Sequence, residues 1–178
     1  MRHLLPAALL LSLLVPAPAL ANPLGDLFHA LFGRHKEVAP VTDPLYLEEC
    51  GACHFAFPPG LLPSRSWSAL MDAAALEDHF GDDATLPEED RAAIARLLDT
   101  ASADRSWYKR SIKVRRSIPA GEAPLRISEV PYIKKRHHEL TEADWKDNPK
   151  VNSMANCNAC HRRAERAVFD DDTVKIPR

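Results

Sequence analysis

Apolar residues recur at helical spacing through much of the chain. Residues 64–80 predict one helix, capped by a serine at position 64 or 66 and ended by Gly81. Four residues spaced four apart lie on one face of this helix, which is its apolar face: Trp67, Met71, Ala75 and His79. A second helix is expected from residue 88, where Thr85 and Glu88 form a capping box, to residue 101. Its buried stripe consists of Ile94, Leu97, Leu98 and Ala101.

Two further helices are predicted nearer the C-terminus. A helix within residues 130–140, capped by Ser128, places Ile133, His137 and Leu140 on one face. Another begins near residue 153 and runs through residue 166. Only the alternation of apolar and basic residues at 112–115 hints at a strand. The pattern therefore predicts a mostly α fold.

The first 21 residues have the order of a secretory signal peptide. Arg2 and His3 precede an apolar run that ends at Val15, and Ala19-Leu20-Ala21 is a small-residue cleavage site. The apolar run is too short to cross about 30 Å of hydrocarbon. We therefore expect an exported protein with no transmembrane segment in its mature chain.

The four cysteines indicate a specific chemistry. They form two pairs, each followed directly by a histidine: Cys50-Gly51-Ala52-Cys53-His54 and Cys157-Asn158-Ala159-Cys160-His161. This is the c-type haem attachment pattern, because two thiols one helical turn apart can add to the two vinyl groups of one porphyrin. The imidazole of the next residue can then reach the iron. The sequence predicts two covalently bound haem c groups, with His54 and His161 as proximal ligands.

Three other interpretations of the four cysteines are considered. Two disulfides are the usual arrangement of four cysteines in an exported protein, but they give the two histidines no role. A four-thiolate zinc site usually keeps its pairs closer together than these. A thioredoxin-like redox site needs one pair in a βαβ pattern, which the sequence lacks.

The second axial ligand of each iron is expected to be a histidine. Haems that only transfer electrons usually have both axial positions filled. His79, on the apolar face of the 64–80 helix, is the expected ligand of the first haem, with Met71 as the alternative. His137 is expected at the second haem. His138 is the alternative, and it is less favoured because it falls on the polar face.

Composition and charge narrow the class of protein. The chain has 178 residues, 46% hydrophobic and 27% charged, with a net charge of -2, so it is a folded protein whose main partner is not nucleic acid. Residues 68–99 carry nine acidic and two basic side chains, a net of -7, and residues 102–136 carry ten basic and three acidic, a net of +7. These are either two solvated faces, with arginines near the haem propionates, or a dipolar surface that orients a redox partner.

Beyond the cysteine motifs, the chain resembles the bacterial periplasmic dihaem cytochrome c family. The resemblance rests on residues 49–54, 57–63, 66–67, 78–81, 126–128, 136–137, 155–161, 164–165 and 169–170. It implies a periplasmic protein with bis-histidine ligation of both irons, through His79 and His137 as distal ligands. It also implies electron transfer to a small oxygen-binding monohaem cytochrome c and receipt of electrons from a membrane-bound cytochrome b.

The expected protein is thus an electron carrier and not an enzyme. A dihaem peroxidase or small-molecule reductase with one open distal site is the main alternative, and an exported structural domain without haem is a third. The fold class is mostly α, with two small helical haem-binding units joined by a basic connector. The expected divisions are a signal peptide at 1–21, an amphipathic segment at 22–44, a first haem unit at 45–101, the connector at 102–129 and a second haem unit at 130–178.

Overall fold

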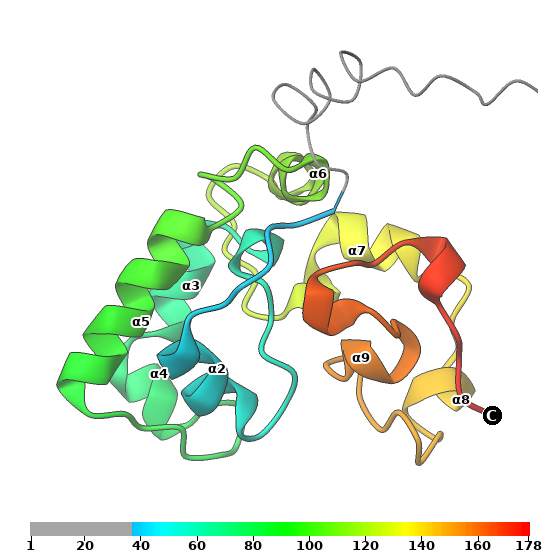
Figure 1. Ribbon diagram of the computed structural model, residues 1–178, viewed down its shortest axis with the longest axis horizontal. Coiled ribbons are helices and arrows are strands. Elements are labelled where there is room, and N and C mark those ends of the chain that lie inside the picture. Colours follow the sequence, from blue (N-terminus) through cyan, green and yellow to red (C-terminus); the bar gives the residue numbers. More distant parts are fainter. Residues whose placement is uncertain (1–36) are drawn as a thin grey trace, which may run out of the picture. The chain divides into compact units, whose positions relative to one another are not determined.

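The computed structural model describes residues 37–178, and the regular structure of this part is helical (Figure 1). The predicted signal peptide and most of the amphipathic segment lie outside the described residues. No helix of the described part is long and apolar enough to cross a membrane. Its α-helices are α2 (Pro44–Gly51), α3 (Ser64–Leu70), α4 (Ala73–Glu77), α5 (Glu88–Ala101), α6 (Lys109–Ser117), α7 (Pro131–Arg136), α8 (Glu142–Trp145) and α9 (Cys157–Cys160). The described part also has four 3₁₀ helices, of which the last two follow α9: η1 (Pro59–Leu61), η2 (Ile127–Glu129), η3 (Ala164–Arg166) and η4 (Asp171–Thr173).

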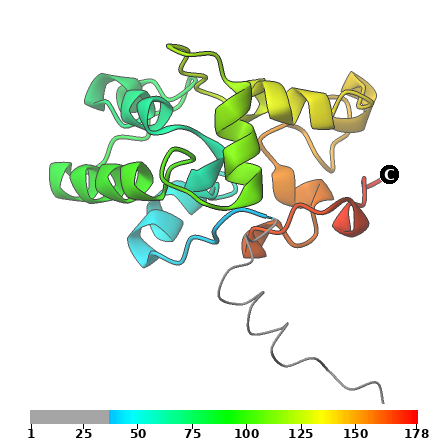
Figure 2. The same cartoon turned by 90° about the horizontal axis from the view of Figure 1, so that it is seen from above.

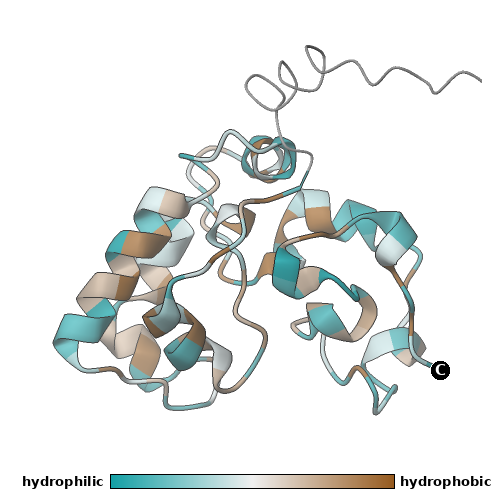
Figure 3. Cartoon of the chain, viewed as in Figure 1, coloured by the Kyte–Doolittle hydropathy of each residue, from teal (hydrophilic) through white to brown (hydrophobic). Residues whose placement is uncertain are grey.

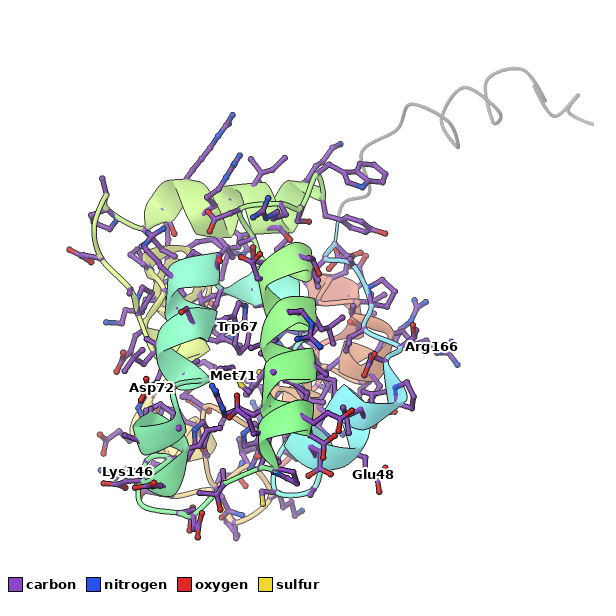
Figure 4. All side chains as sticks on the ribbon, turned by 90° about the vertical axis from the view of Figure 1, so that its left-hand side faces the viewer. Glu48, Trp67, Met71, Asp72, Lys146 and Arg166 are labelled. Atoms are coloured by element: carbon purple, nitrogen blue, oxygen red, sulfur yellow. The ribbon has the colours of Figure 1, made fainter. Side chains whose placement is uncertain are left out.

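The core of the N-terminal half forms where α3 packs against α5. On α5, Ile94 and Leu98 are each only 1% exposed, as the apolar stripe predicts. Figure 3 shows the alternation of hydrophobic and hydrophilic residues along α5. In Figure 4 the side chains of Trp67 and Met71 lie beside α5, and the Trp67 indole Nε1 donates a hydrogen bond to the Pro59 carbonyl at 2.7 Å. This hydrogen bond joins α3 to η1.

The predicted helix over residues 64–80 is wrong in its length. It is broken into α3 and α4, because the Asp72 side chain accepts a hydrogen bond from the Ala74 backbone N–H and starts a new helix. Met71 therefore ends α3 and is buried in the core, 6% exposed. His79 follows α4 in a tight turn, so these two residues do not share a continuous helical face.

The predicted caps also differ from the structure. Pro63 precedes α3 and Pro87 precedes α5, and neither helix has a side-chain cap. Thr85 instead donates its backbone N–H to Asp83. Ser128 lies within η2, and Val130 precedes α7, whose first residue is a proline as expected. Proline fixes the entry of both α5 and α7 in place of the expected hydroxyl caps.

Residues 109–117 form helix α6, so the strand expected near residue 112 is wrong. The residues that alternate as in a strand also fit a helix, on which Ser111 and Val114 are 0% exposed. Helix α6 contacts η1 of the N-terminal half and α7 of the C-terminal half (Figure 2). The predicted basic connector thus contains a helix that packs against both halves of the described chain.

The C-terminal haem motif lies on a shorter helix than predicted. Only α9 and η3 form within residues 153–166. Asn152 and Ala167 have positive φ angles of 63° and 56°, and the backbone of His161 is extended and bridges to Val174. The extended backbone of His161 interrupts the predicted helix, and the left-handed residues 152 and 167 flank it on either side.

Candidate haem sites

The first cysteine motif begins at the end of α2. The Asp43 side chain caps this helix by accepting a hydrogen bond from the Tyr46 backbone N–H at 3.0 Å. Tyr46 is 2% exposed, and its hydroxyl donates to the Phe57 carbonyl at 2.7 Å. The Phe57 ring lies 5.0 Å from the His54 ring, centroid to centroid. Tyr46 therefore anchors the loop that carries the first predicted proximal histidine.

Two predicted ligands face each other in the first site. The ring centroids of His54 and His79 are 6.4 Å apart, and the planes are within 23° of parallel. His54 Nδ1 is 2.9 Å from the Phe55 carbonyl, which leaves Nε2 for a metal ion. The His79 backbone N–H donates to Asp82, and the intervening Phe80 and Gly81 have φ angles of 61° and 107°. This tight turn, not a helix face, presents His79 to His54.

The second site has the same pairing with a different ring orientation. The centroids of His137 and His161 are 5.9 Å apart, and their planes are 75° apart. His137 Nδ1 is 2.9 Å from the Ile133 carbonyl, the α7 turn below it. The Phe169 ring meets His161 edge-on at 5.4 Å. Thus α7 and the C-terminal segment supply the surroundings of these two rings.

A large cavity of about 1130 Å³ opens at the second site. Its lining includes Cys157, Cys160, His161 and His137. Sites for drug-sized ligands are typically about 300–1,000 Å³. The cavity is therefore large enough for a cofactor of at least this size, and both predicted ligands line it.

Both histidine pairs fit an iron between their rings. Two imidazoles bound to one metal ion from opposite sides, with bonds of about 2 Å, have centroids roughly 6 Å apart. The observed separations of 6.4 Å and 5.9 Å match this arrangement. In the second site, His161 Nδ1 is buried and has no hydrogen-bond partner among residues 37–178, whereas His137 Nδ1 lies beside the Ile133 carbonyl.

The surroundings of His161 and His79 favour the neutral form of these two imidazoles. The pKa of His161 is lowered to about 4, first by burial and then by the charges of His137 and Arg110. The pKa of His79 is lowered as well, first by burial and then by the charges of His54 and Arg126. Since neutral imidazole is the form that binds a metal ion, these two rings can act as ligands without losing a proton first.

The structure does not support the disulfide and zinc alternatives considered above. None of the four cysteines is in a disulfide bond. Burial raises the pKa of Cys50 to about 11 and that of Cys157 to about 12, which disfavours the thiolate that zinc binds. In the described part of the chain, no three His, Cys, Asp or Glu side chains form a group that could hold a metal ion. Disulfide and zinc arrangements therefore have no support in this structure.

The alternative axial ligands lie away from the paired rings. Met71 packs in the core, and its carbonyl accepts a hydrogen bond from Arg91. The side chain of His138 is 70% exposed, 3.8 Å from Glu139. The structure thus brings His137, and not its neighbour in sequence, beside His161.

Other residues of the sites have no clear signal in the sequence. Tyr46 contacts the loop after the first motif from 11 residues away, and Arg110 hydrogen-bonds to Glu37 from 73 residues away. Phe169 lies in a stretch that carries the family resemblance, but nothing in the sequence places it against His161. These contacts depend on tertiary packing between distant segments.

A family model confirms the resemblance. The model of the family described as Dihaem cytochrome c matches residues 46–169. The chain belongs to the dihaem cytochrome c family. Dihaem cytochromes c of this family are electron-transfer proteins and not enzymes, and they carry two covalently bound haem c groups. The predicted enzymatic alternative is therefore not supported.

Solved structures agree with this membership. The diheme cytochrome c from Rhodobacter sphaeroides is 45% identical, and the alignment covers 74% of this chain and 100% of that chain with a TM-score of 0.64. A diheme cytochrome type c from Shewanella baltica OS155 is 36% identical, with coverages of 75% and 92% and a TM-score of 0.60. No curated protein matches. The helical fold of this dihaem cytochrome c is thus the fold of its solved relatives.

A second cavity, of about 430 Å³, links the two motifs of this dihaem cytochrome. It is lined by Cys53 and His54 of the first motif, by Asn158 of the second and by Asn156, which directly precedes the second. Asn156 also lines the larger cavity. The backbone segments that carry the two predicted attachment sites therefore lie close together.

Proposed function

We propose that this dihaem cytochrome c carries electrons in the periplasm through two low-spin haems, each bound by two histidines. Cys50 and Cys53 attach the first haem, whose axial ligands are His54 and His79. The second haem is attached and bound by the corresponding set: Cys157, Cys160, His161 and His137. The observation that carries the proposal is that a second histidine ring lies close to the histidine of each cysteine motif, 6.4 Å away at the first motif and 5.9 Å away at the second.

The chain holds its ligands in fixed orientations. Each bound haem iron supplies one-electron exchange between the ferric and ferrous states. Backbone carbonyls of Phe55 and Ile133 orient the rings of His54 and His137 through Nδ1. A ring held in this way keeps its position when the charge of the metal changes. Electron transfer then requires little rearrangement of the protein.

Electrons pass between the haems across the region where the two motifs meet. The 430 Å³ cavity is lined by His54 of the first motif, and Asn156 lines both this cavity and the one at the second site. This proximity supports transfer within the molecule. The protein thus acts as a two-haem relay.

The proposed partners are a small oxygen-binding monohaem cytochrome c, which accepts electrons, and a membrane-bound cytochrome b, which donates them. The unequal charge of residues 68–99 and 102–136 supports orientation of such partners. On α6 four exposed cations, Lys109, Lys113, Arg115 and Arg116, make no ion pair within the described residues. Contacts between redox proteins are typically small and are weakened by salt. The signal-peptide pattern of residues 1–21 supports export to the periplasm.

Substitution of His79 by alanine tests the ligand assignment, with His138→Ala as the matched control. Loss of an axial ligand should leave one haem high-spin and five-coordinate, because the Phe57 ring that also lies near His54 cannot bind iron. The control removes a side chain that is 70% exposed and should leave both haems low-spin. If His79→Ala kept two low-spin haems in optical and EPR spectra, the proposed ligation of the first haem would be wrong.

A further inference from the structure

A buried ion pair lies beside the second haem site. The guanidinium of Arg110, on α6, binds the carboxylate of Glu37 through two nitrogens: Nη2 lies 3.0 Å from Oε2 and 3.2 Å from Oε1, and Nε lies 3.2 Å from Oε2. The two side chains are only 13% and 14% exposed. Of the salt bridges found among residues 37–178, this one is the most deeply buried. Such a pair contributes little net stability, because the cost of removing two charges from water offsets their attraction.

The pair is tied to the proximal histidine of the second site. Glu37 Oε2 accepts the Phe169 backbone N–H at 2.8 Å, and Arg110 Nη2 donates to the Phe169 carbonyl at 3.2 Å. The ion pair thus holds both backbone groups of Phe169. The ring of Phe169 in turn meets His161 edge-on at 5.4 Å.

The ion pair also contacts α7, the helix that precedes the predicted distal ligand. Arg110 Nη1 donates to the hydroxyl of Tyr132, which lies on α7 five residues before His137. Arg110 lines the same 1130 Å³ cavity as both predicted ligands, and its charge acts on His161. One buried cation therefore contacts α7, which ends beside His137, and Phe169, whose ring packs against His161.

The balance of charge at this position matters for an iron that changes its own charge. A positive charge in a poorly solvated place disfavours the ferric state, which carries one more positive charge than the ferrous state. Glu37 cancels the charge of Arg110 at close range. Asp171, which also acts on His161, is 81% exposed and pairs with Arg136, so water screens its effect.

We propose that Glu37 and Arg110 are positioning residues of the second haem: they hold Phe169 against His161 and keep the local charge neutral, which sets the potential of that haem. This inference rests on the proposed function, because it takes His137 and His161 as the ligands. It predicts that removing either charge alone shifts the second potential, in opposite directions. Removing both should restore it.

The experiment is an EPR-monitored redox titration of the holoprotein. The second-haem signal is first identified as the one that changes in His137→Ala. In Glu37→Gln the ratio of ferrous to ferric second haem at a fixed potential should rise several-fold, and in Arg110→Met it should fall, where tenfold corresponds to about 59 mV. The double variant should lie near the unmodified protein, and the first haem should not change.

Asp171→Asn is the matched control, since it removes the same charge from an exposed position. Its effect on the second haem should be clearly smaller than that of Glu37→Gln. Shifts of the same sign in the two single variants, as general loosening of the site would give, would overturn the proposal. Equal shifts at both haems, or no shift, would overturn it as well. A high-spin second haem in the unmodified protein would instead contradict the proposed ligation, which the same spectra report separately.

Discussion

The contact between η1 and α6 offers a sharp test of the packing that places Arg110. Gly60 is buried in η1, and a Cβ atom added there would lie 2.5 Å from Ser111 Oγ on α6. The next nearest atoms, Ser111 Cβ at 3.6 Å and Ser106 Oγ at 3.8 Å, are at ordinary contact distances. The Cβ atom of alanine at position 60 would therefore clash with one atom, the hydroxyl oxygen of Ser111.

The free-energy change follows from this geometry. Overpacking a tight core usually costs about 1–3 kcal/mol, so Gly60→Ala should destabilise the protein by about that amount. Ser111 is 0% exposed, and its hydroxyl has no hydrogen-bond partner in the described part of the chain. Ser111→Ala alone should be neutral or slightly stabilising, because it removes a buried group that is not paired. In the double variant the conflict disappears, and most of the lost stability should return.

Guanidinium unfolding of the four holoproteins, followed by far-UV circular dichroism, measures these differences. A favourable coupling energy of at least about 1 kcal/mol between the two substitutions is expected, since neighbours in contact are not additive. If Gly60→Ala cost as much in the Ser111→Ala background as alone, the reasoning would be refuted. The close approach of η1 to α6 would then not be what requires glycine at this position.

Three more predictions concern the ligands, the core and the partner. His137→Ala should give one high-spin haem in optical and EPR spectra, and unchanged spectra would contradict its role at the second haem. Trp67→Phe should lower the free energy of unfolding by about 1–2 kcal/mol in guanidinium titrations, because the Pro59 carbonyl loses its 2.7 Å hydrogen bond; an equal stability would show that water replaces it. The rate of electron transfer to an acidic monohaem acceptor in stopped flow should fall as ionic strength rises from 50 to 500 mM (roughly 14 to 4 Å Debye length), whereas a rate independent of salt would argue against the basic face of α6 as a docking surface.

The sequence predicts the chemistry of this protein better than the path of its backbone. Two motifs that use every cysteine leave few alternatives, and the family model confirms the class that they indicate. His79 and His137 do lie beside the predicted proximal histidines. The expected route to His79 is wrong, since a helix interrupted by Asp72 and a turn with positive φ angles replace the continuous face.

The remaining differences have a common physical origin. Local patterns identify helix α5, because its apolar stripe and acidic first turn lie within one segment. They do not distinguish the strand expected at residue 112 from helix α6, whose buried face is defined by η1 and α7. They also cannot show that Glu37 meets Arg110, because 73 residues separate the two. Tertiary contacts decide these features.

The central claim is that each haem has two histidine ligands. The most direct measurement is a low-temperature EPR spectrum of the ferric holoprotein, with a pyridine haemochrome count to establish two haems per chain. We predict two low-spin signals and no high-spin signal. The signals should be distinguishable, because the ring planes meet at 23° in the first site and 75° in the second. A high-spin signal that accounts for one of the two haems would contradict the account.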